Sequence, residues 1–168
     1  MPYMAINLGG VAVGCAIILV VLVRWWFAEK HQPTALVPFV LSLLYGMLAS
    51  LAAIGSVSAL GIAAWTAVWT ANVSGYAALV WGVGGTAPDV TRSQQLVLTA
   101  GGYVIVLLLT ALLFALWKWA PRVPNWKLFF GALAGAAVAL SGNVAGVAAV
   151  PLGSSVNLLG AWFTAAVG

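Results

Sequence analysis

Long apolar runs separated by short polar segments dominate the pattern of this chain. Roughly 20 apolar residues in a helix cross a bilayer core about 30 Å thick. Five runs reach or approach that length and therefore predict five transmembrane helices. They cover residues 4–27, 36–54, 59–83, 97–119 and 128–150. The pattern predicts an all-α fold, a polytopic transmembrane helix bundle that forms one membrane domain over residues 1–168.

The last part of the chain leaves a sixth span open. Pro151 to Ser155 should break the fifth helix, because proline lacks a backbone N–H and clashes with the preceding turn. The apolar tail, residues 151–168, is short for a crossing of its own. It fits a re-entrant piece, an interfacial helix or the end of a sixth span that starts near Gly146.

Tryptophans and cations gather where the first and fourth spans end. Indole rings and snorkelling cations prefer the membrane–water interface, so these residues are predicted to be interfacial anchors. They are Arg24, Trp25, Trp26, Trp117, Lys118, Trp119, Arg122, Trp126 and Lys127.

The cations give no clear membrane orientation under a five-span count. Arg24, Lys30 and Arg92 then fall on one side, whereas Lys118, Arg122 and Lys127 fall on the other. This tie leaves the positive-inside rule without a result. The density of cations between residues 118 and 127 favours a cytoplasmic position for that link.

Composition places the chain in lipid. Its residues are 64% hydrophobic and 5% charged, against about 25% charged residues in soluble domains. We therefore predict a multi-pass protein of the cell (plasma or inner) membrane, with the lipid bilayer as its first partner. Six Lys/Arg residues form no basic run, which argues against nucleic acid as a partner.

Candidate chemistry is scarce. Cys15 is the only cysteine and His31 the only histidine, and the acids Glu29 and Asp89 both fall in predicted loops. Ion-coupled transporters place charged residues within their spans, whereas here Arg24 and Lys118 sit only at span ends, where they can snorkel to the interface. The sequence predicts no catalytic residue, no cofactor and no metal site, and hence a protein that is not an enzyme. Glu29 and His31 are close enough in sequence to pair in a solvated loop.

Small residues recur at three- and four-residue steps in the first and fifth predicted spans. This small-xxx-small spacing lets helix backbones approach closely, either within one subunit or between subunits of an oligomer. The predicted helix-packing or assembly residues are Gly10, Gly14, Gly131, Ala134, Gly135, Ala139, Gly142 and Gly146.

A few polar and aromatic side chains lie within the apolar runs. An amide in hydrocarbon needs a partner, so each polar residue either lines a passage or makes an interhelical hydrogen bond. The candidates for a polar lining are Asn72, Ser141, Asn143 and Asn157. Trp65, Trp69 and Tyr76 share one helix face, which suits either a stacked ligand or lipid contact.

Three functional hypotheses follow from this pattern. The first is a non-enzymatic multi-pass membrane subunit that scaffolds or lines a passage within a homo-oligomer or a larger complex with other membrane subunits. The second is a self-sufficient channel or facilitator for a small neutral solute. The third is a membrane assembly protein of a mobile element, acting in conjugation or in a virion.

Overall fold

A computed structural model describes residues 5–52, 58–90, 98–121, 123–141 and 144–167, with the side-chain surroundings of residues 144–147 excepted. This described part is helical apart from short connections and one pair of two-residue strands. Its elements are β1 (Ile6–Asn7), α1 (Leu8–Ala28), α2 (Pro33–Ala52), α3 (Ala59–Tyr76), the π-helical turn η1 (Ala77–Gly82), β2 (Asp89–Val90), α4 (Ala100–Trp119), α5 (Asn125–Ala139) and α6 (Val144–Val167). The predicted all-α helical fold is confirmed.

Four of the described helices are long and apolar enough to cross a bilayer. They are α1, α2, α4 and the Ala148–Val167 portion of α6. These four helices support a membrane protein, whereas the predicted count of five spans is not reproduced. Helix α5 has 15 residues, which at about 1.5 Å per residue is shorter than a bilayer core.

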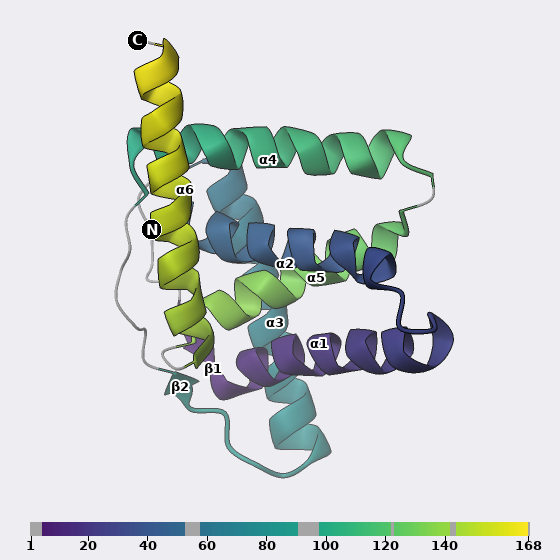
Figure 1. Cartoon of the computed structure of the whole chain (residues 1–168). Coiled ribbons are helices and arrows are strands. Elements are labelled where there is room, and N and C mark those ends of the chain that lie inside the picture. Colours follow the sequence, from purple (N-terminus) through teal and green to yellow (C-terminus); the bar gives the residue numbers. More distant parts are fainter. Residues whose placement is uncertain (1–4, 53–57, 91–97, 122, 142–143, 168) are drawn as a thin grey trace.

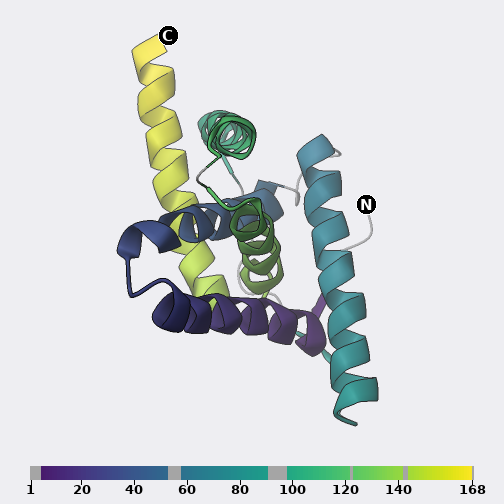
Figure 2. The same ribbon diagram turned by 90° about the vertical axis from the view of Figure 1, so that its right-hand side faces the viewer.

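The helices lie in two directions. In Figure 1, α1, α2, α4 and α5 run across the view, and α3 and α6 stand upright on opposite sides of them. In Figure 2, α3 and α6 remain upright, and α4 is seen along its axis. Helices α2 and α5 lie side by side at the centre, α1 packs on α5 and α3, and α4 packs on α6 and α2.

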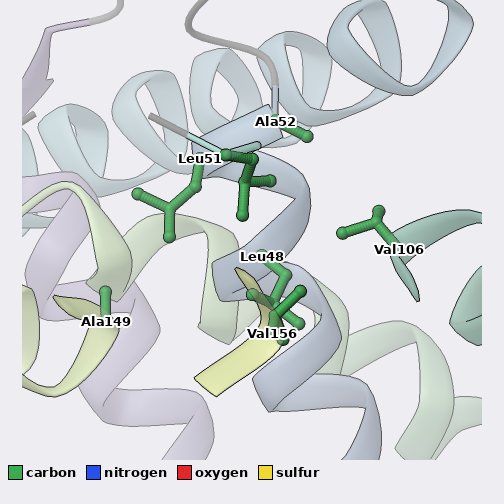
Figure 3. Close-up of a cluster of buried hydrophobic side chains, with 7 residues drawn as sticks. Leu48, Leu51, Ala52, Val106, Ala149 and Val156 are labelled. Carbon is green, nitrogen blue, oxygen red and sulfur yellow. The ribbon is translucent and has the colours of Figure 1, made fainter. Parts of the chain in front are cut away.

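Two clusters of buried apolar side chains hold these layers together. The first includes Leu48 and Leu51 of α2, Val106 of α4 and Val156 of α6 (Figure 3). The second joins β1, α3 and α5 on the other side of the α2–α5 pair. Its buried members are Ile6, Val68, Ala71, Ala136, Ala137 and Leu140. The first cluster therefore joins α6 to the central α2–α5 pair, and the second cluster joins α3 to it.

The predicted fifth span, residues 128–150, is wrong as a single helix. Helix α5 ends at Ala139, and the backbone N–H of Ser141 donates to the Val138 carbonyl at 3.0 Å. The next helix, α6, begins at Val144. Glycine and asparagine in the intervening sequence are poor helix formers. The expected break at Pro151 is wrong too, because α6 continues through this proline, as apolar membrane helices can.

The predicted division of loops between two sides of the membrane is also wrong. Helices α1 and α4 end, and α2 and α5 begin, at the same end of the molecule, on the right in Figure 1. The reason is that α3 lies across the bundle and does not return the chain to that end. Counting α3 as a further crossing reverses the apparent direction of every later helix.

Candidate functional site

The crossing of α1 and α3 is built from two glycines and two asparagines. Backbone meets backbone where Gly9 faces Gly75, with no room for a Cβ atom on either residue. Beside this contact, the Asn72 Oδ1 atom accepts the Asn7 amide at 3.0 Å, and Asn72 Nδ2 donates to the Ala5 carbonyl at 2.9 Å. Asn7 also caps α1 by accepting the Gly10 amide at 2.7 Å.

The crossing of α4 and α6 has the same construction. Gly101 faces Gly160 backbone to backbone, again with no room for a Cβ atom. Asn157 Oδ1 accepts the Thr99 amide at 2.9 Å and lies 3.2 Å from the Thr99 hydroxyl. Thr99 caps α4 by accepting the Gly102 amide at 3.2 Å, as Asn7 caps α1.

These contacts bear on the predicted polar lining. Asn72 and Asn157 direct their amides at backbone groups that begin the neighbouring helix, and Ser141 donates its hydroxyl to the Val138 carbonyl. All three side chains, Ser141 buried and the two asparagines half-buried, therefore satisfy polar groups of this chain. Asn143, the fourth candidate, lies outside the described residues.

The third close contact is the α2–α5 interface. Gly131 and Gly135 of α5 meet backbone atoms of α2 at Phe39 and Leu43, and Gly46 of α2 meets the backbone of Ala132. Two buried serines of α2 extend hydroxyls across the same contact. Ser42 Oγ donates to the Lys127 carbonyl at 3.1 Å, and Ser50 Oγ donates to the Ala136 carbonyl at 3.3 Å.

The other predicted helix-packing residues also face helices of the same chain. A Cβ atom on Gly10 would meet Asn72, and one on Gly14 would meet Ala137 and Val138. Ala134 and Ala139 are buried in α5. Gly142 lies outside the described residues, and Gly146 belongs to α6, separate from the α5 face that carries Gly131 and Gly135.

A buried ion pair lies where α1 and α4 end and α2 and α5 begin. The Lys127 side chain is 2% exposed, and its Nζ atom donates to Glu29 Oε2 at 2.7 Å and to the Ala35 carbonyl at 2.6 Å. Predicted as an interfacial anchor, Lys127 is thus paired inside the protein. Glu29 pairs with this lysine, whereas His31 lies edge-on to Trp26, with ring centroids 4.0 Å apart.

The remaining predicted anchors surround this ion pair or lie near it in sequence. The Trp126 ring has the Arg24 guanidinium carbon 5.1 Å from its centroid and Lys127 Nζ at 5.7 Å, which places both cations for cation–π contact. Trp25 donates its indole N–H to the Gln32 carbonyl at 2.8 Å. Trp26, Trp117, Lys118 and Trp119 are exposed, and Arg122 lies outside the described residues.

Two pockets adjoin these features. One of about 980 Å³ opens beside the ion pair and is lined by Glu29, Lys30, Gln32, Thr34 and Lys127, among others. A smaller one of about 290 Å³ lies next to the α1–α3 crossing and is lined by Asn7, Asn72, Trp69, Tyr76 and Trp81. Of the predicted aromatic face, Trp69 and Tyr76 reach this pocket.

Sequence reasoning missed the recurrence of these sites. A glycine pair lies in the first turn of both α1 and α4, and Asn-x-x-Gly recurs in α3 and α6. Comparing the two halves of the sequence would therefore have revealed that the two helix crossings repeat.

Within the described ranges, no group of three or more His, Cys, Asp or Glu residues gathers as metal ligands would. No protein family, characterised protein or solved structure matches this chain.

Proposed function

We propose that this chain is a non-enzymatic, multi-pass subunit of the cell membrane that scaffolds an oligomer or a larger membrane complex through its helix faces. One observation carries the proposal. The three polar-lining candidates that the structure describes, Asn72, Ser141 and Asn157, direct their side chains at backbone groups of this chain. That use favours a scaffold over a channel, because these polar atoms are engaged by backbone groups of the chain itself, whereas a solute path needs polar atoms left to bind the solute.

The outer helix surfaces supply the contact area for such a role. Helix α4 exposes large apolar side chains along its length, including Leu107, Leu108, Leu112 and Phe114. Helices α1 and α6 do the same with Leu19, Val20, Leu158 and Trp162. In a bilayer these faces contact either lipid or other membrane helices, and association needs only close packing and a few hydrogen bonds.

Photo-crosslinking in native membranes tests this scaffold function. A photoreactive residue at Leu107, which is 67% exposed, should give a discrete adduct with another protein chain. The same residue at the neighbouring Val106, which is 2% exposed, is the matched control and should give none. Adducts with lipid alone from Leu107 and from Leu158, together with a monomer in mild detergent, would refute the scaffold proposal. Solute flux through liposomes of the purified protein would favour the channel instead.

The cations support a cytoplasmic position for the end that carries the ion pair. Arg24, Lys30, Lys118 and Lys127, the four cations in the described part of the chain, all lie at or near this end. Cytoplasmic loops carry the excess of Lys and Arg in membrane proteins. The opposite end, where Asp89 follows the exposed Thr86, then faces outward.

Labelling of single cysteines checks the orientation. In a Cys15→Ser background, Gln32→Cys should react with a membrane-impermeant maleimide only after the cells are opened. Thr86→Cys should react in intact cells, because Thr86 is exposed and lies two residues before Pro88, whose carbonyl accepts the Leu8 amide at the start of α1. The reverse pattern would show that the cation-bearing end faces outward.

A further inference from the structure

The two halves of the chain correspond in sequence and in order of elements. Each half runs through a capping residue, a long helix with a glycine pair in its first turn and tryptophan in its last turn (α1 or α4), a central helix (α2 or α5) and a crosswise helix (α3 or α6). With one constant spacing, a subset of positions in the first two helices carries the same residue in both halves. These pairs include Gly9 with Gly101, Gly10 with Gly102, Trp25 with Trp117, Leu36 with Leu128 and Leu48 with Leu140.

The crosswise helices α3 and α6 align with a second constant spacing. Their identical pairs are Gly61 with Gly146, Ala63 with Ala148, Ala64 with Ala149, Asn72 with Asn157 and Gly75 with Gly160. The spacing between equivalent residues changes once, between α2 and α3 in the first half and between α5 and α6 in the second half. An insertion or deletion in that connection therefore accounts for it.

The contacts between the halves follow a two-fold axis. On the parallel helices α2 and α5, Phe39 meets its counterpart Gly131, and Leu43 meets its counterpart Gly135. A further counterpart pair, Ala35 with Lys127, is in contact, and Met47 and Ala139 belong to one buried cluster. Contact of each residue with its own equivalent, at four-residue steps, is the pattern of two parallel helices along a two-fold axis.

The arrangement of the other helices agrees with that axis. Helices α3 and α6 stand on opposite sides of the central pair in Figures 1 and 2 and run in opposite directions. A rotation about the direction of α2 and α5 therefore exchanges them, and it also exchanges α1 with α4. The same rotation carries the contact of Asn72 with Asn7 onto that of Asn157 with Thr99.

We infer that this chain consists of two copies of one three-helix unit, residues 5–82 and 97–167, and that the α2–α5 interface is the surface by which one unit recognises the other. This makes the chain a fused dimer with parallel repeats, a relation known in other membrane proteins. The inference is independent of the scaffold function proposed above.

One departure from symmetry, at the buried ion pair, falls where symmetry would be costly. Lys127 lies next to its counterpart Ala35 on the axis, and two lysines there would bring like charges together without water. Glu29, which neutralises Lys127, has Pro121 as its counterpart. Fusion of the two units allows each of these positions to carry a different residue in the two copies.

Exchange of the order of the two units tests the inference on the whole chain. The permuted protein begins at residue 97, runs to residue 168, continues with residues 83–96 as a linker and ends with residues 1–82. The axis makes the gap from α6 to α1 equivalent to the gap from η1 to α4, so the same linker length should suffice. We expect a monodisperse protein whose thermal midpoint lies within about 4 °C of the parent.

Two comparisons decide the result. Gly135→Ala should lower the thermal midpoint of the permuted and the parent protein equally, because both contain the α2–α5 interface. In the parent, Asn72→Leu and Asn157→Leu should each lower it by a similar amount, about 4 °C or more. A permuted chain that aggregates, or destabilisation by only one of the two asparagine variants, would overturn the inference.

Discussion

Replacing Glu29 by glutamine is expected to lower the free energy of unfolding by about 3 kcal/mol. The substitution leaves the Lys127 ammonium in a site where its side chain is 2% exposed and without the carboxylate it contacts at 2.7 Å. Removal of one partner from a buried ion pair costs about 3–5 kcal/mol. The expected value lies at the lower end because Glu29 is itself 20% exposed. Unfolding by a titration of SDS into mild detergent measures the loss.

The second half of the pair supplies a double-mutant cycle. Lys127→Met should also destabilise the protein, whereas Glu29→Gln combined with Lys127→Met should recover part of the loss, since no unpaired charge remains buried. Lys118→Met is the matched control, because Lys118 is exposed, and it should have little effect. Strictly additive losses in the double variant would contradict a direct interaction between Glu29 and Lys127.

Gly135→Ala is expected to destabilise the protein by about 3 kcal/mol, more than a single added methyl group normally does. The new Cβ atom would fall on the backbone carbonyl of Leu43 at the centre of the α2–α5 interface. Backbone cannot rotate away as a side chain can, so the two helices must separate. Overpacking of this kind costs about 1–3 kcal/mol, and occasionally more. Thermal unfolding followed by tryptophan fluorescence measures the effect.

Gly82→Ala is the matched control for that change. The nearest atom to a Cβ at Gly82 is the Ala77 carbonyl oxygen at 4.0 Å, which is ordinary contact. The same added methyl group should therefore leave the thermal midpoint unchanged or slightly raised. Equal destabilisation by both substitutions would mean that close approach of α2 and α5 is not what Gly135 provides.

Sequence patterning located the apolar helices but not their directions. The predicted first, second and fourth spans agree with α1, α2 and α4 to within a few residues, because polar loops and tryptophans mark their ends. The hydropathy pattern predicts α3 as one more crossing because it reports only length and apolarity along the chain. It carries no information on the angle at which one helix meets the next.

Part of the candidate site could be predicted from the sequence. The small residues Gly10, Gly14, Gly131 and Gly135 were singled out by spacing, and each proves to face another helix. The ion pair of Glu29 with Lys127 was not found, because the two residues are far apart in sequence and the span count placed them on opposite sides of the membrane. Because α3 was assigned the wrong direction, the sequence did not predict the partner of Lys127, the most buried charged residue in the described part of the chain.

The shortness of α5 has a consequence for the bilayer itself. Its 15 residues extend about 22 Å, less than the hydrocarbon thickness of about 30 Å. An open pocket lies beside the ion pair at the N-terminal end of this helix, so water that enters it would shorten the low-dielectric path along α5. In an energised membrane the voltage drop would be steepest along that line, so the charges of Lys127 and Glu29 would experience a stronger field than residues on the outer helices.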